Sequence, residues 1–285
     1  MNWIWWILGA IVCAVLWASF IEPHWYRLRR VTVHGQKKIR KPITILHLSD
    51  IHFTKNEGSK RGFFQKLSML NPDLIFLTGD IIDNDEGIET AARMISGLRG
   101  RYGTFLVLGN HDYYDYQWID NVRYHLGLSK ASIHRNNVSR YVSEMKRIGV
   151  HVLVNESMRL EVHGNPVLIG GTDDPVTQKI DFERTLHNLG PSTFNILLIH
   201  QLDGLLKLSH HGIDLVFAGH THGGQIRFPL IGPLVCDTKL PRRYVEGLHK
   251  YQDMTVFVSR GLGAGRSLFP RFACRPEAIF FEILP

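Results

Sequence analysis

The sequence is poor in cysteine and has no internal repeat or low-complexity tract. Its three cysteines, Cys13, Cys236 and Cys274, are far apart, odd in number and without C-x-x-C spacing. These features count against a disulfide framework and against a cysteine-rich metal site. We therefore expect three packed free thiols.

The sequence also lacks the glycine patterns of common nucleotide-binding folds. It contains no P-loop, no Rossmann fingerprint and no nucleophile elbow. Residues 261–265, with the sequence Gly-Leu-Gly-Ala-Gly, superficially resemble a phosphate loop, but no helix pattern follows them. Chemistry that depends on those motifs is therefore not expected.

The chain does contain enough apolar residues for a core, together with an excess of basic charge. Its 285 residues are 44% hydrophobic, which fits one α/β domain plus an anchor. The formal net charge of +7 favours anionic partners, a class that includes phosphates, nucleic acid and anionic lipid. Charge alone does not choose among them.

A long apolar run begins the chain. The first twenty residues carry no charged side chain and are long enough, as a helix, to cross a membrane. Tryptophans cluster toward both ends of the run, as in interfacial aromatic belts. A cleavable signal peptide is not favoured, because no Lys or Arg precedes the run and no A-x-A site follows it. We predict a single-pass anchor over residues 1–21, with residues 2–21 in the membrane.

A basic stretch follows the anchor. Its seven positive residues are Arg27, Arg29, Arg30, Lys37, Lys38, Arg40 and Lys41. By the positive-inside rule they place the following domain on the cytoplasmic face of the cell (inner) membrane. We interpret residues 22–42 as a basic linker that either rests on anionic headgroups or is solvated.

Residues 43–285 are predicted to form one α/β domain. In its first half, apolar runs that end at a polar residue indicate buried strands at 43–49, 73–79 and 104–109. Helical patterns near 59–70 and 87–99 separate these strands, which are therefore expected to be parallel. Polar residues at their carboxyl ends would then gather at one edge of the sheet.

The second half repeats this alternation. Strands are expected at 194–199 and 214–218, with a short helix at 202–208 between them. Further strand patterns occupy 151–154, 158–162, 167–170, 255–258 and 278–283. Two sheets packed face to face, with helices outside, accommodate all of these strands. Residues 113–137, which are aromatic and basic, fit less well and are interpreted as an insertion that is either a lid or a packed surface helix.

Five short blocks at the predicted strand ends carry the chemistry. They are Asp50-Ile51-His52, Gly79-Asp80-Ile81-Ile82-Asp83, Gly109-Asn110-His111-Asp112, the lone His200 and Gly219-His220-Thr221-His222. Seven of their side chains, Asp50, His52, Asp80, Asn110, His200, His220 and His222, offer oxygen or nitrogen donors. Such donors suit two adjacent divalent metals, which can activate water and clamp a phosphoryl oxygen. The pattern indicates an enzyme that acts on phosphate esters.

In this order, the blocks resemble the calcineurin-like metallophosphoesterases, whose pattern is D-x-H, G-D-x-x-D, G-N-H-D/E, H and G-H-x-H. The resemblance implies a four-layer α/β/β/α sandwich for residues 43–285, as the catalytic domain. It also implies a first metal held by Asp50, His52, Asp80 and His222, and a second held by Asp80, Asn110, His200 and His220. The metals expected are Mn, Fe or Zn, with Co or Ni as alternatives.

The same resemblance assigns roles to the remaining acidic and basic side chains of the blocks. His111 would stabilise the phosphoryl oxygens or protonate the departing oxygen, and Asp83 would orient His111. Asp112 is left with two open roles, one structural and one in support of the site. The sequence at 200–203, His-Gln-Leu-Asp, departs from the H-x-P-D form frequent in the family, which leaves the shape of that loop open.

The later part of the chain resembles a membrane-associated bacterial branch of the family. The segments that carry this likeness are 219–225, 259–263 and 274–277, and the branch includes proteins similar to UDP-2,3-diacylglucosamine pyrophosphatases. Four arginines interleaved with apolar residues are candidate substrate contacts: Arg260, Arg266, Arg271 and Arg275. They either grip phosphate or are solvated charges beside core aromatics.

Three functions are consistent with these observations. The favoured one is a membrane-tethered phosphodiesterase or pyrophosphatase that acts on a lipid-linked precursor such as a UDP-diacylglucosamine-like molecule. The alternative is a broad-specificity phosphodiesterase or nuclease, with nucleic acid as a less favoured partner. A non-catalytic scaffold of the same fold is a third, against which the complete set of donors argues. The sequence does not determine the oligomeric state.

Overall fold

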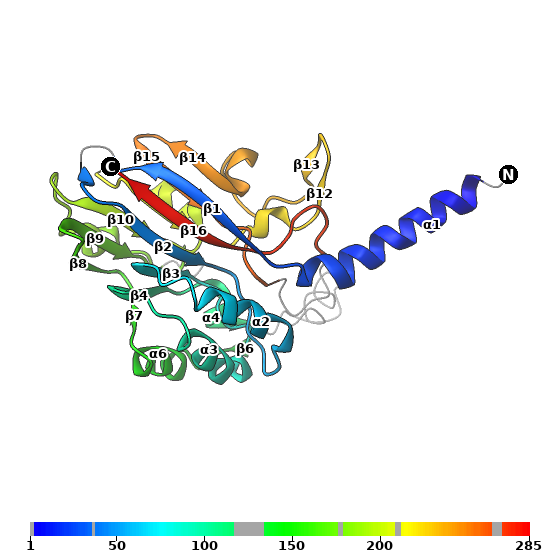
Figure 1. The fold of residues 1–285 in the computed structure, drawn as a ribbon, viewed down its shortest axis with the longest axis horizontal. Helices are drawn as coiled ribbons and strands as arrows, with labels where there is room; N and C mark the ends of the chain where they lie inside the picture. Colours follow the sequence, from blue (N-terminus) through cyan, green and yellow to red (C-terminus); the bar gives the residue numbers. More distant parts are fainter. Residues whose placement is uncertain (1–2, 36–37, 117–133, 176–178, 209–211, 264–269) are drawn as a thin grey trace.

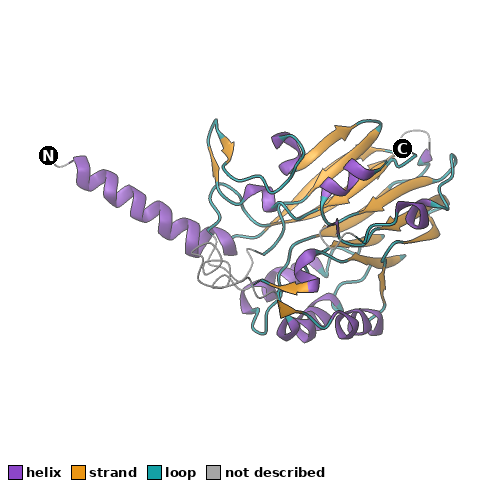
Figure 2. Ribbon diagram, turned by 180° about the vertical axis from the view of Figure 1, so that it is seen from behind, coloured by secondary structure: helices purple, strands orange, loops and turns teal. Residues whose placement is uncertain are grey.

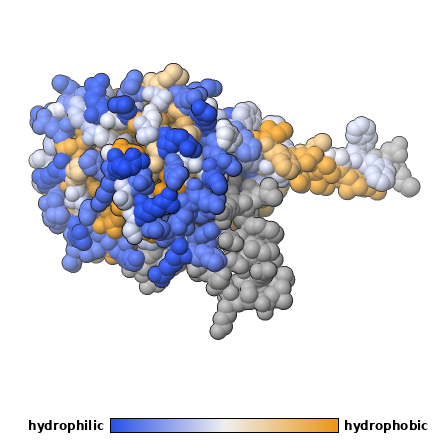
Figure 3. All heavy atoms as spheres, turned by 90° about the horizontal axis from the view of Figure 1, so that it is seen from below, coloured by the Kyte–Doolittle hydropathy of each residue, from blue (hydrophilic) through white to orange (hydrophobic). Residues whose placement is uncertain are grey.

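The computed structural model describes residues 3–285 apart from 36–37, 117–133, 176–178, 209–211 and 264–269. An N-terminal helix projects from a layered α/β body (Figure 1). This helix consists of α1 (Trp3–Leu16), a π-helical turn η1 (Trp17–Ile21) and a 3₁₀ turn η2 (Glu22–His24). No residue of α1 is buried, and apolar atoms are exposed along most of the helix (Figure 3). By length and composition the helix is able to cross a membrane.

The first sheet contains the beginning and the end of the domain. Its six strands follow the order β1-β16-β2-β3-β4-β7. Their bounds are β1 (Arg27–His34), β16 (Glu277–Leu284), β2 (Ile43–Leu48), β3 (Leu74–Thr78), β4 (Gly103–Val107) and β7 (Val150–Val152). Strands β2, β3, β4 and β7 are parallel neighbours, as predicted for the first three. Strand β16 lies between β1 and β2 and runs antiparallel to β2.

Strand β1 differs from the expectation that residues 22–42 are a linker. It pairs in parallel with β16, from Arg27 opposite Glu277 to His34 opposite Leu284. Val31 and Val33 pack against the apolar cluster between the sheets. The polar and basic residues that alternate with them, Arg30, Thr32 and His34, conceal this period-two pattern in the sequence. Residues 27–34 therefore belong to the sheet, and only a shorter segment separates the N-terminal helix from the domain.

The second sheet has the order β14-β15-β11-β10-β9-β8. Its bounds are β14 (Gly247–Tyr251), β15 (Met254–Val258), β11 (Leu215–Ala218), β10 (Phe194–Leu198), β9 (Asn165–Gly171) and β8 (Glu156–Val162). The four central strands are parallel, and the two edge strands join their neighbours antiparallel. The carboxyl ends of β10 and β11 therefore lie at the same edge of this sheet.

Aromatic side chains fill the space between the two sheets. Phe76 of β3 meets Phe217 of β11 with ring centroids 5.2 Å apart, and Phe217 meets Phe281 of β16 at 5.0 Å. All three are buried members of one apolar cluster. Burial of such rings stabilises the sandwich strongly, because each removes a large apolar area from water.

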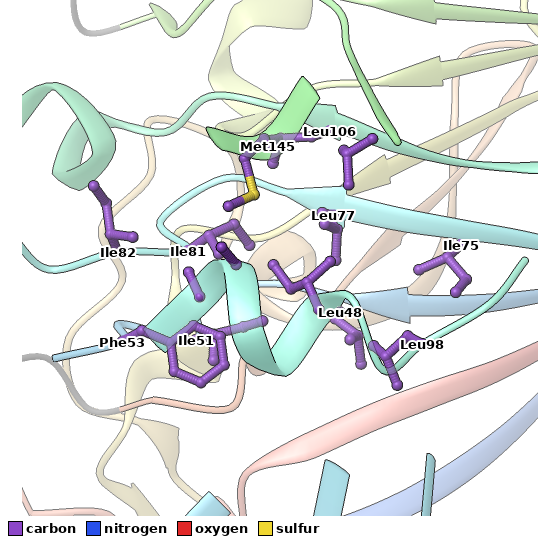
Figure 4. Packing of buried hydrophobic residues seen from close by; sticks show 14 of the residues in the cluster. Leu48, Ile51, Phe53, Ile75, Leu77, Ile81, Ile82, Leu98, Leu106 and Met145 are labelled. Atoms are coloured by element: carbon purple, nitrogen blue, oxygen red, sulfur yellow. The ribbon is translucent and has the colours of Figure 1, made fainter. Parts of the chain in front are cut away.

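Helices cover the outer faces of both sheets (Figures 1 and 2). The first sheet is covered by α2 (Gly58–Leu67), α3 (Ile88–Ile95) and α6 (Val138–Arg147). In Figure 4, Met145 of α6 packs toward the strand residues Leu77 and Leu106. The second sheet is covered by α7 (Phe182–Leu186) and a 3₁₀ segment η6 (Leu202–Lys207). The predicted α/β/β/α sandwich is confirmed.

Short elements surround the edge where the predicted donors lie. They are η4 (Asp85–Gly87), α4 (Asn110–Tyr113), η7 (His222–Gly224), η8 (Arg242–Val245) and the two-residue strands β5 (Tyr114–Asp115), β6 (His134–Arg135), β12 (Arg227–Phe228) and β13 (Gly232–Pro233). Strands β5 and β6 pair at the two ends of the predicted insertion 113–137. Its centre, 117–133, lies outside the described residues, so its role as a lid or a helix stays a prediction.

Candidate metal centre

The loops after β2, β3, β4, β10 and β11 bring the seven predicted donors to one edge of the sandwich. These loops extend the parallel pairing past the strands: the amide of Asp50 donates to Gly79 O at 3.0 Å, and that of His52 donates to Asp80 O at 3.0 Å. Five of the donor residues have left-handed backbones, with φ of 49° at Asp50, 52° at His52, 52° at Asp80, 71° at His220 and 49° at His222. This conformation is uncommon for residues other than glycine and recurs at functional sites.

Three donors form a first group, consisting of Asp50, His52 and His222. One ligand atom from each lies within 4.8 Å of the others. The Nε2 atoms of His52 and His222 are 3.2 Å apart, and His222 Nε2 is 3.7 Å from Asp50 Oδ1. The second carboxylate oxygen, Asp50 Oδ2, is buried and accepts no hydrogen bond within the described part of the chain. A buried, unpaired carboxylate oxygen beside imidazole nitrogens fits a cation.

A second group consists of Asp80, His200 and His220. His200 Nε2 lies 3.3 Å from Asp80 Oδ2 and 3.2 Å from His220 Nδ1. The backbone carbonyl of Thr78 lies 2.8 Å from His200 Nδ1, which orients the ring so that Nε2 faces the group. Asn110 Oδ1 is buried and accepts no hydrogen bond from any described residue. Its amide oxygen is thus available as a further ligand, as the sequence predicts.

One carboxylate oxygen of Asp80, Oδ2, faces both groups of donors. Its Oδ1 accepts a hydrogen bond of 2.8 Å from the His111 amide. Its Oδ2 lies 3.3 Å from His200 Nε2 and 3.9 Å from His52 Nε2. One buried carboxylate oxygen therefore stands between the two groups, which is the position of a bridging ligand.

The electrostatics of the second group favour positive charge. Burial alone would lower the pKa of His200, yet the adjacent carboxylate of Asp80 raises that pKa to about 10. The same histidine, together with His111, outweighs the effect of burial on Asp80 and holds the pKa of that carboxyl well below its usual range. Asp80 is thus kept ionised although it is buried.

His111 and Asp83 lie together, as predicted. His111 Nδ1 is 3.2 Å from Asp83 Oδ1, and the His111 side chain remains 22% exposed. Burial would lower the pKa of His111, but the carboxylates of Asp80 and Asp83 outweigh it and the net shift is upward. Burial would raise the pKa of Asp83, but its contacts with His111 and His52 hold that pKa below its usual range.

Asp83 has a second contact that the sequence did not predict. Its Oδ1 also lies 3.1 Å from His52 Nδ1. With the proton held on Nδ1, the Nε2 lone pair of His52 points into the first group. One carboxylate therefore orients both a predicted ligand and the predicted acid.

Asp112 bonds to the backbone of the loops that carry Asp80 and Asn110, so it combines the two roles left open by the sequence, one structural and one in support of the site. Its buried carboxylate accepts four backbone hydrogen bonds, from Gly109 at 2.8 Å, Asp80 at 2.9 Å, Ile81 at 3.0 Å and Ile82 at 3.1 Å. It ties the loop after β3 to the loop after β4, and so fixes Asp80 relative to Asn110. The only sequence signal for this was its place in the Gly-Asn-His-Asp block.

The predicted substrate arginines that lie in the described part of the chain, Arg260, Arg271 and Arg275, have partners within the protein. Arg271 is completely buried, which corrects its assignment as a substrate contact. Its guanidinium donates to the carbonyls of Cys274 at 3.0 Å and Arg260 at 2.8 Å, and lies 3.2 Å from His222 Nδ1. A single arginine in the sequence gives no sign of the carbonyls that surround it. Its role here is to hold the loops around the first group.

The other arginines are engaged in different ways. Arg260 pairs with Glu246 at 2.9 Å. Arg275 lies over the Trp25 ring at 3.7 Å and donates to the Trp25 carbonyl at 3.0 Å, so it joins the domain to the N-terminal segment. Arg266 lies outside the described residues. A phosphate contact by Arg260, Arg266 or Arg275 stays a prediction.

Comparisons with known proteins show the family of the chain. A model of the calcineurin-like phosphoesterase family matches residues 43–224. The chain is 30% identical over 278 residues to the uncharacterized metallophosphoesterase YkuE of Bacillus subtilis, covering 94% of this chain and 88% of that protein. It is 27% identical over 283 residues to the phosphodiesterase YaeI of Escherichia coli, with coverages of 93% and 91%. It is 26% identical over 323 residues to the UDP-2,3-diacylglucosamine pyrophosphatase LpxG of Chlamydia trachomatis, with coverages of 98% and 95%.

Proposed function

Because the chain belongs to the calcineurin-like phosphoesterase family, we propose that it hydrolyses phosphodiester or pyrophosphate bonds in a membrane-associated or lipid-linked substrate. The protein is a metal-dependent phosphoesterase, as its family and its relatives named as a phosphodiesterase and a pyrophosphatase indicate. The observation that carries the proposal is the single oxygen of Asp80 that faces two donor groups. A UDP-diacylglucosamine-like precursor is the substrate type we favour, by analogy with the name of one relative.

The donor set fits two divalent ions. Asp50, His52, Asp80 and His222 would hold the first, and Asp80, Asn110, His200 and His220 the second. Carboxylate, amide and imidazole donors suit Mn, Fe or Zn, with Co or Ni as alternatives. Two such ions, when bound, lower the pKa of water and neutralise charge on a phosphoryl group. The buried unpaired oxygens of Asp50 and Asn110 support this assignment.

His111 has the position and charge of a general acid. Its side chain is 22% exposed, more than that of His52, His200 or His222, and two carboxylates stabilise its protonated form. In the proposed reaction it donates a proton to the departing oxygen, which matters most when the leaving group is a poor one. Asp83 keeps the imidazole oriented and cationic until that transfer.

The N-terminal helix supports the membrane part of the proposal. Its 22 residues, Trp3–His24, have the length and apolar composition of a membrane span. We propose a single-pass anchor, with the catalytic domain on the cytoplasmic face of the inner membrane because the basic residues follow the span. Relatives that include a transmembrane protein with a metallophosphoesterase domain are consistent with this.

Lipid mass spectrometry tests the proposal. The full chain, loaded with Mn²⁺ in detergent, is incubated with membrane lipid extract and, in a parallel assay, with oligonucleotides, and an Asp80→Asn variant serves as the control. We expect a lipid-linked diester or pyrophosphate to disappear, and a lipid monophosphate to appear, only with the unsubstituted chain. Untouched lipids together with cleaved oligonucleotides would contradict the proposal and favour the broad phosphodiesterase or nuclease alternative.

A further inference from the structure

An exposed apolar hairpin lies beside the metal centre and contributes none of the predicted ligands. It consists of residues 226–235, in which β12 and β13 pair antiparallel. Its exposed apolar side chains, with their exposed fractions, are Phe228 (42%), Leu230 (109%), Ile231 (62%), Leu234 (56%) and Val235 (69%). Large apolar side chains rarely gather on a surface without a partner.

The hairpin is tied to the end of the N-terminal helix through one short segment. The amide of Arg271 donates to the Ala18 carbonyl at 2.9 Å, which attaches this segment to the helix. The next residue, Phe272, donates to Gln225 at 2.9 Å and accepts from the Arg227 amide at 2.9 Å. The base of the hairpin is therefore one residue away from a contact with the helix end.

A second set of contacts stabilises the junction between the helix end, residues 271–273 and the base of the hairpin. The rings of Phe228 and Phe272 lie 5.7 Å apart, and the Glu22 carboxylate accepts from the Ala273 amide at 3.1 Å and from Trp17 Nε1 at 3.0 Å. Glu22 is buried, so these hydrogen bonds are sheltered from water. Figures 1 and 2 show the hairpin at the end of the domain from which α1 leaves.

The charges of the hairpin fit a membrane surface. Residues 226–235 contain no acidic residue, and the one basic residue, Arg227, pairs with Glu246 at 2.9 Å. Exposed Arg242 and Arg243 lie in the neighbouring η8 turn, and Arg242 reaches to the Gly232 side of the hairpin tip. An apolar tip with exposed arginines beside it matches the acyl boundary and the anionic headgroups of a bilayer.

The aromatic residues at the helix end mark the level of the bilayer surface. Trp17 and Trp25 pack edge to face with ring centroids 5.6 Å apart, and Trp25 is 48% exposed. Tryptophans at this position in a span lie at the headgroup level. The base of the hairpin is attached to this same junction through Phe272, so the hairpin starts near that level.

We propose that the hairpin 226–235 docks into the bilayer interface as a second membrane contact, next to the anchoring helix. The occupant of this apolar surface is lipid rather than a second copy of the chain, because the surface continues the membrane-facing end of α1. The inference rests on the proposed membrane anchoring. It does not depend on which phosphate ester is cleaved.

The hairpin also forms one wall of a cavity that contains predicted metal ligands. The cavity has a volume of 380 Å³, and its lining includes Ile226, Leu234 and Val235 together with His220 and His222. A hairpin seated in the interface places the mouth of this mostly apolar cavity against lipid. A substrate with acyl chains then reaches the metal centre without leaving the bilayer.

The test measures lipid contact at single labelled positions of the full chain in nanodiscs that contain anionic lipid. An environment-sensitive fluorophore is attached to Leu230→Cys in a Cys13→Ser/Cys236→Ser background. The buried Cys274 is retained, because it does not react in the folded protein. Two controls accompany it: native Cys13 in α1, labelled in a Cys236→Ser chain, and Glu161→Cys on the exposed face of β8, at the end of the domain away from α1.

We expect a lipid-borne quencher to remove most of the emission at positions 13 and 230, and aqueous iodide to quench only position 161. Quenching by lipid at 13 but by iodide at 230 would overturn the hairpin contact and leave the anchor intact. Loss of lipid quenching at both positions would overturn the anchor as well. Protection of position 230 from both quenchers would show that a second copy of the chain covers the hairpin, which also overturns the proposal.

Discussion

The metal centre and the membrane-facing edge of the molecule are built on opposite principles. By the membrane-facing edge we mean the surface that we propose to contact lipid, which consists of the helix end at 17–25, residues 270–275 and the hairpin 226–235. At the centre, buried polar atoms converge from five strand ends, and a single oxygen of Asp80 faces two groups of donors. At the edge, apolar side chains such as Leu230, Ile231 and Val235 are exposed on the surface.

This difference determines how each region responds to change. A buried polar site depends on individual atoms, because each lost partner leaves another group unpaired in a low dielectric. An apolar contact depends on total area, so its loss is gradual. We therefore expect steep effects of single substitutions at the centre, and smaller, substrate-dependent effects at the edge.

The largest effect is expected for Asp80→Asn. The substitution removes the charge that faces both donor groups but keeps the size of the side chain. Turnover of a model diester should fall below detection, while the fold, measured by circular dichroism, is retained. Asp253→Asn, on an exposed turn, is the matched control and should keep full activity. Normal turnover by the Asp80 variant would show that the centre does not work as described.

A smaller loss is expected for His111→Ala. General acid catalysis contributes about 10²–10⁴-fold, so turnover of a diester with an alkyl leaving group should fall within that range. An activated nitrophenyl diester needs little protonation and should lose far less. Equal losses for the two substrates, measured as kcat, would exclude His111 as the proton donor.

A third effect concerns Asp83→Asn and the pH profile. Outer partners of metal ligands contribute about 10–100-fold to activity or metal affinity, and Asp83 contacts both His52 and His111. The Asp83 carboxylate raises the pKa of His111, so its removal lowers that pKa. The protonated acid is then lost at lower pH. We expect the alkaline limb of the kcat–pH profile to shift to lower pH. A limb that does not move would show that Asp83 does not set the pKa of His111.

The smallest effect is expected for Leu230→Ser/Ile231→Ser at the membrane-facing edge. Neither residue lines the cavity beside His220. Turnover of a water-soluble diester should be unchanged, whereas hydrolysis of a lipid-linked diester in nanodiscs should fall by several-fold through KM. A Lys66→Ser variant on the exposed side of α2 controls for loss of surface side chains. A parallel fall with both substrates would indicate a folding defect instead of lost membrane contact.

The two regions were also predictable from the sequence to different extents. Polar residues that end apolar runs, such as Asp50 after β2 and His220 after β11, are visible in a linear pattern, because strand ends meet in space. The sandwich and the grouping of donors followed from that pattern together with the family resemblance. The backbone role of Asp112 was left open, since four amides from two loops leave no mark in the sequence.

The membrane-facing edge was less predictable for physical reasons. Strand β1 was taken for a linker because its arginines outweigh its valines in any count of hydrophobicity. Arg271 was predicted to be a substrate contact or a solvated charge, whereas it is buried and donates to the carbonyls of Arg260 and Cys274. The hairpin 226–235 has two-residue strands, too short for a period-two signal. These features depend on contacts between remote segments, which no local pattern encodes.

Metal stoichiometry tests the central claim most directly. The full chain, freed of metal by chelation and titrated with Mn²⁺ or Zn²⁺, is analysed by elemental mass spectrometry after removal of unbound ions. We predict two ions bound per chain, and loss of both when Asp80 is replaced by Asn. A chain that binds one ion, or an Asp80→Asn variant that still binds two, would contradict a centre built around the shared oxygen of Asp80.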